Sequence, residues 1–365
     1  MKNKGLIAVM PLIFTFSCST NNSKTNLEEE TTITTSVSSE STSEEEKTTM
    51  EKYKTKRETS IIADSNFKNG FRLISPESTN QYFECNLDYN GEAESDTNGK
   101  GERPNYWDMC QWWTPFNFKD ADYKKVGNSH QYENESRLLS VDPEKGEITM
   151  KLDAYEEYQE LYNGPKPGDK SWSHFLIQQS FPDELKLSPS NIDSAEYGLH
   201  VRFDITVNEV TYKGEGTPVG TDCAQLLFYL QLCNYVPEGE SEEESGKNGA
   251  KVWFGLPILD TRYTTVDKYV AGDTGFQGAT GHLIYTIPSK TVLNTSEKIA
   301  IGKTYHVDID VLEYIQEAFI YAATNGYLTN CKWNNIKVHY MNFGWEIPGQ
   351  YCVSSTLKDL DVYVG

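Results

Sequence analysis

Apolar and polar residues alternate along much of the second half of the chain. Every second residue from Tyr197 to Val207 is apolar, and polar residues such as His200 and Asp204 lie between them. A period of two predicts a β-strand with one buried and one exposed face. Similar or more continuous apolar runs predict eight further strands, at residues 147–152, 175–180, 224–233, 251–259, 282–287, 304–310, 337–347 and 354–364.

One segment follows the helical period instead. Leu312, Ile315, Phe319 and Ala322 are three and four residues apart within 311–325, and Gly326 is a natural stop. Many strands with one packed helix predict a mainly β protein built as a two-sheet jelly-roll sandwich. In a jelly roll the larger sheet is curved, so we expect one sheet to present a concave face to solvent.

The N-terminus has the pattern of an export signal. Lys2 and Lys4 precede an apolar run over 5–16, which is too short to cross a bilayer as a helix. The following Thr15-Phe16-Ser17-Cys18 resembles the lipobox of bacterial lipoproteins, in which the cysteine is acylated and becomes the new N-terminus. The resemblance implies a signal peptide over 1–17 and a lipid anchor at Cys18 that holds the protein on a membrane, outside the cytoplasm and at the cell surface. The alternative is an ordinary signal peptide cleaved nearby.

Composition divides the remaining chain in two. Residues 18–60 are rich in Ser, Thr and Glu and hold few apolar residues, so they cannot offset their ordering entropy and should form a tether. Residues 61–365 are long enough for one large β-sandwich domain. The net charge of −21 makes nucleic acid and anionic headgroups unfavourable partners.

Cysteine usage leaves two readings open. Six cysteines remain besides Cys18, and an even number in an exported chain is compatible with disulfides, whereas six reduced thiols are the alternative. The sequence does not choose among the possible pairings of these six residues: Cys85, Cys110, Cys223, Cys233, Cys331 and Cys352.

The most distinctive strand runs from Lys337 to Ile347. Met341, Phe343, Trp345 and Ile347 would share its core face, which leaves Tyr340, Asn342, Gly344 and Glu346 on the other. The polar faces of neighbouring strands add amides, an arginine and aromatic rings, and aligned in one curved sheet they would form a groove. The residues that we expect to bind a ligand there are Gln178, Arg202, Tyr229, Gln231, Trp253 and Asn342.

Such a groove suits a glycan, because sugar hydroxyls need paired donors and acceptors and the apolar faces of sugar rings stack on Trp or Tyr. The alternative is that Tyr229 and Trp253 fill gaps under loops while the polar groups are merely solvated. The segment 105–116, with Trp107, Trp112 and Trp113, would either rim the groove or plug the end of the sandwich.

A resemblance to known proteins supports the sugar hypothesis. The stretches 253–262 and 342–349 resemble secreted bacterial proteins that are similar in outline to concanavalin-A-like jelly rolls. The Gly344-Trp345-Glu346 strand is also similar to the late strand of glycoside hydrolase family 12, which implies that Glu346 is the acid/base. The strand comparable to that of the family's nucleophile begins Lys251-Val252-Trp253 and lacks its glutamate.

A glycosidase needs a second carboxyl group at a defined distance from the first. The residues offer Asp204, Asp222 and Asp260, of which Asp260 is the tentative catalytic partner of Glu346; a structural ion pair with Arg262 is the alternative. We therefore predict a surface lipoprotein that binds polysaccharide or another glycan. The alternatives are a glycoside hydrolase that uses Glu346 and a structural or adhesin-type module.

Other cofactor chemistry finds little support in the sequence. Asp308 and Asp310 share a strand face just before the predicted helix, so they would either bind a structural calcium ion or serve the start of that helix. We expect no other metal or cofactor.

Overall fold

The computed structural model describes residues 59–365, apart from 78–82, 90–93, 96–106, 182–187 and 275–278. The predicted signal peptide, Cys18 and nearly all of the tether lie outside the described residues. Within the described part of the chain, no helix has both the length and the apolar character needed to cross a bilayer.

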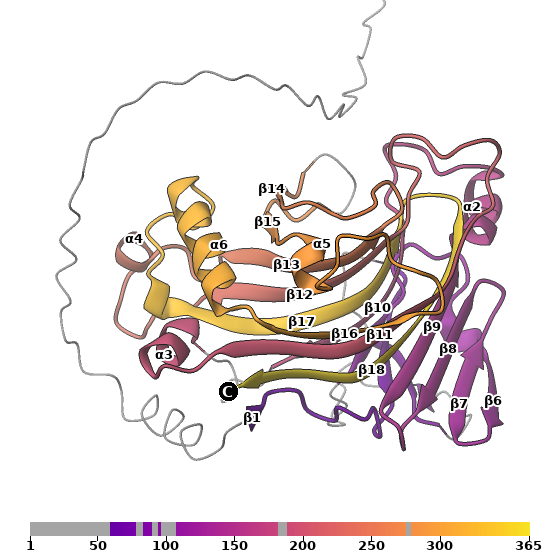
Figure 1. Ribbon diagram of the computed structural model, residues 1–365, viewed down its shortest axis with the longest axis horizontal. Helices are drawn as coiled ribbons and strands as arrows, with labels where there is room; N and C mark the ends of the chain where they lie inside the picture. Colours follow the sequence, from indigo (N-terminus) through magenta and orange to yellow (C-terminus); the bar gives the residue numbers. More distant parts are fainter. Residues whose placement is uncertain (1–58, 78–82, 90–93, 96–106, 182–187, 275–278) are drawn as a thin grey trace, which may run out of the picture. The chain divides into compact units, whose positions relative to one another are not determined.

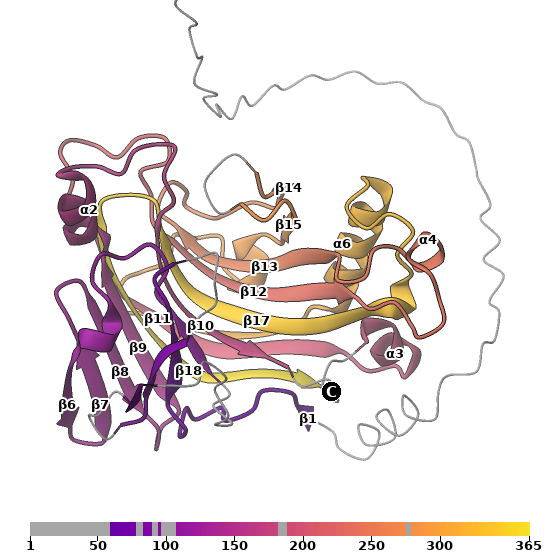
Figure 2. The same ribbon diagram turned by 180° about the vertical axis from the view of Figure 1, so that it is seen from behind.

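The strands form two sheets (Figures 1 and 2). The eight-stranded sheet has the order β16 (Thr304–Asp310), β11 (Leu199–Tyr212), β18 (Tyr351–Val364), β9 (Glu147–Asp153), β8 (Arg137–Asp142), β7 (Ser129–Glu133) and β6 (Asp122–Val126), with β1 (Thr59–Ser60) also paired to β18. The ten-stranded sheet has the order β14 (Tyr269–Gly272), β15 (Leu283–Thr286), β13 (Lys251–Asp260), β12 (Gln225–Asn234), β17 (Ile336–Ile347), β10 (Ser173–Ser180), β5 (Asp108–Cys110), β2 (Phe71–Ile74), β3 (Phe83–Leu87) and β4 (Glu94–Ser95).

The chain passes repeatedly from one sheet to the other. β11 belongs to the eight-stranded sheet, β12 and β13 to the ten-stranded sheet, and β16, β17 and β18 alternate between the two. Most pairs are antiparallel, whereas β13–β15 and β2–β5 are parallel. This is the predicted mainly β, two-sheet jelly-roll sandwich, so the fold prediction is confirmed.

The core lies between the inner faces of the two sheets. Alternate residues of β11 from Leu199 to Val207 are buried, as the period of two predicts. Phe203 reaches across the interface, with its ring 6.0 Å from those of Phe228 on β12 and Phe343 on β17. Aromatic rings at these distances fill the space between layers and fix how the sheets face each other.

All nine predicted strands form, with bounds that differ by a few residues. The predicted helix over 311–325 is α6 (Leu312–Thr324), which contacts β13 and α3. The prediction of a single helix was incomplete: the described residues also form α2 (Ala154–Tyr162), α3 (Pro189–Ser194), α4 (Glu242–Ser245), α5 (Ser289–Val292) and the 3₁₀ turns η1 (Phe118–Asp120) and η3 (Trp333–Asn335).

The six cysteines after Cys18 are all free thiols, so the alternative of reduced cysteines describes this structure. The carboxylates considered for calcium are engaged by protein groups. Asp308 contacts Arg202, His200 and Tyr363, while Asp310 accepts hydrogen bonds from the backbone N–H groups of Leu199 and of Leu312, the first residue of α6.

Candidate functional site

Four neighbouring strands of the ten-stranded sheet build the candidate site. β10, β17, β12 and β13 lie side by side (Figure 1), and their outer face, turned away from the core, carries the predicted polar residues. Because the pairs are in register, the side chains form rows that run across the strands. The first row is His174–Glu346–Gln225–Asp260. Further along lie the rows Gln178–Asn342–Tyr229–Gly255 and Ser180–Tyr340–Gln231–Trp253.

Glu346 occupies the middle of the first row. Its side chain is only 19 % exposed, and Nε1 of Trp172 donates a hydrogen bond of 3.3 Å to its Oε2. Withdrawal from water disfavours the ionised form, so the pKa of Glu346 rises from 4.5 to about 7; the negative charge of Asp273 acts in the same direction. Glu346 therefore holds its proton through most of the acidic range.

His174 faces Glu346 across the strand pair, with its Nε2 3.8 Å from Oε2 of the carboxyl group. The other ring nitrogen, Nδ1, lies 2.7 Å from the carbonyl oxygen of Trp172, which can only accept. Nδ1 therefore carries the hydrogen, and the lone pair of Nε2 is turned towards Glu346. Burial lowers the pKa of His174 to about 4, and the charge of Arg137 contributes. The pair thus combines a neutral imidazole with a weakly acidic carboxyl group.

A buried ion pair supports this row from behind. Arg137 of β8 and Glu157 of α2 are fully buried, and their side chains meet at 2.8 Å and 3.2 Å. Thr114 and Ser136 donate two further hydrogen bonds of 2.8 Å to the same carboxylate, so its charge is well satisfied. Nη1 of Arg137 then donates to the carbonyl oxygen of His174 at 2.8 Å. This contact fixes the backbone that carries the imidazole.

The second polar row is anchored at its outer end. Arg72 pairs with Asp108 at 2.7 Å, and Nε2 of Gln178 donates to the same carboxylate at 3.3 Å. That hydrogen bond engages the amide nitrogen, whereas Oε1 of Gln178 is buried and has no partner. Asn342 follows in register and is 6 % exposed. An unsatisfied buried carbonyl is costly, so a group that supplies a donor would stabilise it.

Aromatic side chains gather at the far end of the face. The ring of Trp253 lies edge-on to those of Tyr340, at 5.4 Å, and Tyr229, at 5.9 Å. Gln231 lies in register with Tyr340 and Trp253, is 2 % exposed, and its Oε1 has no hydrogen-bond partner. Two of the three buried amide oxygens without partners in the described residues, those of Gln178 and Gln231, therefore lie on the face that also carries the aromatic rings; the third belongs to Asn234.

Gly344 separates Glu346 from Asn342 and has a purely structural role. A glycine inside a strand often marks a bend or the close approach of a ligand or of another backbone. The φ of Gly344 is +151°, and a Cβ atom there would lie 2.3 Å from the carbonyl oxygen of Phe175 on β10. The group that approaches is the neighbouring strand, which explains why only glycine fits.

The structure brings together most of the predicted residues. Gln178, Tyr229, Gln231, Trp253 and Asn342 share the face with Glu346, as the period of two requires. This placement leaves their proposed roles untested.

Arg202 does not join them. It lies on β11 of the eight-stranded sheet, where it pairs with Asp308 at 3.0 Å and its guanidinium lies over the ring of Tyr363. The period of two gave its position within the strand correctly but could not tell which sheet the strand joins.

The candidate carboxylate partners of Glu346 are all engaged. Asp204 contacts His306 at 2.6 Å on the eight-stranded sheet. Asp222 accepts hydrogen bonds from Tyr212 and from the backbone of Gln350. Asp260 lies on the right face but is held by Arg262, which was the alternative considered for it.

Sequence reasoning missed the groups around Glu346. His174 continues the period of two that contains Leu176 and Gln178, but β10 begins two residues earlier than predicted. Trp112 of the tryptophan-rich segment packs edge-on against His174 at 5.6 Å, with its Nε1 buried and without a partner. Trp107 is instead fully buried in the core. The segment therefore contributes to both the site and the core.

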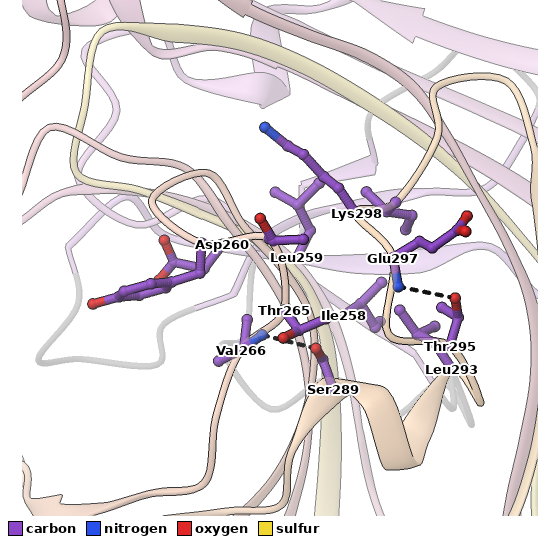
Figure 3. Close-up of a pocket in the computed structure, with 13 residues that line it drawn as sticks. Ile258, Leu259, Asp260, Thr265, Val266, Ser289, Leu293, Thr295, Glu297 and Lys298 are labelled. Carbon is purple, nitrogen blue, oxygen red and sulfur yellow. Dashed lines mark hydrogen bonds between the residues drawn. The ribbon is translucent and has the colours of Figure 1, made fainter.

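The face is more enclosed than the open concave groove that we predicted, because its amides are almost inaccessible. A small surface pocket lies elsewhere, beyond the end of β13 and beside α5 (Figure 3). Asp260 is among its lining residues, together with Thr265, Ser289 and Lys298, whereas Glu346 is not.

Comparisons with known proteins give only distant similarities. No model of a known protein family and no curated protein matches the sequence. A cellulase derived from Cel12A of Rhodothermus marinus has a TM-score of 0.35 and 14 % identity, covering 67 % of this chain and 96 % of that one. The family 12 xyloglucanase from Bacillus licheniformis has a TM-score of 0.36 and 11 % identity, covering 67 % and 97 %.

The xyloglucanase domain of NopAA from Sinorhizobium fredii, in complex with cellobiose, is similar at a TM-score of 0.31 and 11 % identity, covering 67 % of this chain and 96 % of that one. The Bacillus licheniformis xyloglucanase is described as a member of family 12, the glycoside hydrolase family that the Gly344-Trp345-Glu346 strand resembles. Similarities at this level do not establish a family, an activity or a substrate for this chain.

Proposed function

We propose that the outer face of the ten-stranded sheet binds a glycan chain. The observation that carries the proposal is a face that combines the partly exposed side chains of Gln225, Tyr229, Trp253 and Tyr340 with two buried amide oxygens that have no partner, Oε1 of Gln178 and Oε1 of Gln231. Native proteins rarely leave such atoms unpaired, so each one needs an explanation. A sugar hydroxyl is a donor that would satisfy either oxygen once the side chains of the face move to admit it.

The aromatic end of the face supports the same ligand class. Trp253, Tyr229 and Tyr340 offer apolar surface on which a sugar ring can pack, while the amides fix its hydroxyls. Tyr269 of the edge strand β14 is 42 % exposed and belongs to the same neighbourhood, since it is close enough for its ionised form to raise the pKa of Tyr229. Burial raises the pKa of Tyr229 well above 10, so its hydroxyl remains a donor at physiological pH.

The proposal includes the place where the protein works. A lipid on Cys18 and a tether over 18–60 would hold the domain outside the cytoplasm and present it at the cell surface. Two or more acyl chains anchor a protein stably, because each buried CH₂ contributes about 0.8 kcal/mol. The partners are then a polysaccharide or another glycan and the lipid bilayer.

A second candidate function is hydrolysis with Glu346 as the acid. The observation in its favour is the pKa of about 7, which suits a group that donates a proton near neutral pH. Cleavage also needs a carboxylate or an activated water on the other side of the bond. A structural or adhesin-type module with no small ligand is the third possibility.

Binding is tested with the full chain and immobilised oligosaccharides of β-glucan, xyloglucan, xylan, mannan and starch. The variant Gln231→Met keeps the side chain's shape but removes the unpaired amide. It should therefore weaken binding by about tenfold and raise the free energy of unfolding by about 1 kcal/mol. Gln131→Met, on β7 of the other sheet, is the matched control and should leave binding unchanged. If no glycan of the panel binds, the proposal is wrong.

A further inference from the structure

Gln225 is the residue that faces Glu346 on the side away from His174. The two residues are directly opposite in the β12–β17 pair, and Gln225 is in turn opposite Asp260 in the β12–β13 pair. Side chains at opposite positions of an antiparallel pair have Cβ atoms about 5 Å apart. Gln225 is partly exposed, so a ligand that reaches Glu346 also reaches this amide.

The orientation of the Gln225 amide is fixed by its neighbours. The guanidinium of Arg262 donates hydrogen bonds of 2.5, 2.9 and 3.2 Å to the Asp260 carboxylate. Nε2 of Gln225 donates to Oδ2 of the same carboxylate at 2.8 Å. An ionised carboxylate only accepts hydrogen bonds, so the NH₂ group of Gln225 must face Asp260. The carbonyl oxygen of the amide is then the atom left for a ligand beside Glu346.

The same arrangement places an amide, and not a carboxylate, opposite Glu346 in the β12–β17 pair. A retaining glycosidase needs two carboxyl groups about 5 Å apart, and the position at that spacing holds an amide. Asp273, beyond β14, is close enough for its charge to act on Glu346, but its Oδ2 accepts hydrogen bonds from the backbone N–H and the hydroxyl of Thr280. In β10, β17, β12 and β13 the only other carboxylate is Asp260, which is 4 % exposed and engaged by Arg262 and Gln225. It can neither attack a sugar nor activate a water molecule while it makes these contacts.

We infer that Gln225 is a ligand-binding residue, positioned by Asp260 and Arg262, that accepts a sugar hydroxyl beside Glu346, and that the site holds glycans without cleaving them. The inference rests on the proposed function, and it favours glycan binding over the second candidate, hydrolysis with Glu346. It makes the protein a receptor for neutral hydroxyl-bearing chains, and Asp260 a positioning residue.

The first experiment incubates the full chain with each oligosaccharide that it binds and measures the release of reducing ends. Bound oligosaccharide recovered intact supports the inference. Cleavage by the wild type that disappears in Glu346→Gln overturns it while leaving glycan binding in place. If no oligosaccharide of the panel binds, the proposed function fails, and the role of Gln225 fails with it.

The second experiment measures affinities of variants in the row. Gln225→Met should lose about tenfold in affinity, as expected for one hydrogen bond, relative to Gln131→Met. An asparagine at position 260 can donate as well as accept, so Asp260→Asn no longer fixes the orientation of the Gln225 amide. The site should then discriminate less between the best oligosaccharide and an epimer that differs at a single hydroxyl, and the ratio of the two affinities should fall towards one. This ratio would not change if Asp260 only stabilised the fold. An affinity of Gln225→Met equal to that of the control overturns the role of Gln225.

Discussion

Replacing Glu346 by glutamine should change the stability of the protein in a manner that depends on pH. The folded-state pKa of about 7 lies above the ordinary value of 4.5. Below about pH 4 the carboxyl group is protonated in both the folded and the unfolded chain and contributes no difference. As the pH rises from about 4.5 to about 7, Glu346 ionises in the unfolded chain but stays protonated in the folded one. The free energy of unfolding therefore falls over this range and levels off above about pH 7.

The size of the effect follows from the two pKa values. Each tenfold difference in proton affinity corresponds to 1.36 kcal/mol, so an ionised Glu346 costs the folded state about 3 kcal/mol. Glutamine has nearly the same shape and never ionises. Glu346→Gln should therefore be about as stable as the wild type near pH 4 and about 3 kcal/mol more stable near pH 8.

Urea unfolding followed by tryptophan fluorescence at a series of pH values measures this difference. Glu160→Gln, at an exposed position of α2, is the matched control and should follow the wild type at every pH. A difference between Glu346→Gln and the wild type that stays constant from about pH 4 to about pH 8 would refute the reasoning, because it would mean that Glu346 ionises normally in the folded state.

Three further predictions concern the fold and the anchor. Glu157→Ala leaves the buried Arg137 without its carboxylate and should lower the free energy of unfolding, measured in urea, by about 3–5 kcal/mol. Glu133→Ala removes an exposed ion pair and should lower it by less than about 1 kcal/mol. Equal losses in the two variants would contradict this prediction. Gly344→Ala forces β10 aside and should destabilise the protein well beyond Gly127→Ala, a glycine at φ +63° with open space around it, by the same measurement. Cys18→Ser should abolish acyl labelling and release the protein from membranes; a variant that stays bound has another anchor.

The fold was largely predictable because its strands obey a local rule. Half-buried strands such as β11 show a period of two, and the helix α6 shows its own period. The strands before β9 were not predicted; β2, β5 and β7 among them are only three to five residues long, too short for alternation to stand out.

The site was predictable only in part, for a different reason. A strand pattern tells which residues share a face, so Gln178, Gln231, Asn342 and Glu346 were grouped correctly. It does not tell which strands are neighbours, and Arg202 was therefore assigned to the wrong sheet. The roles of His174 and Gln225 depend on cross-strand register, which long-range pairing sets.

The position of β18 has a consequence for the order in which the chain acquires its structure. β18 pairs with β9, β11 and β1, so strands that are synthesised much earlier meet in the eight-stranded sheet only through residues 351–364. Contacts between residues so far apart in sequence form slowly, because the intervening loop must close first. A nascent chain that still lacks β18 therefore cannot complete this sheet.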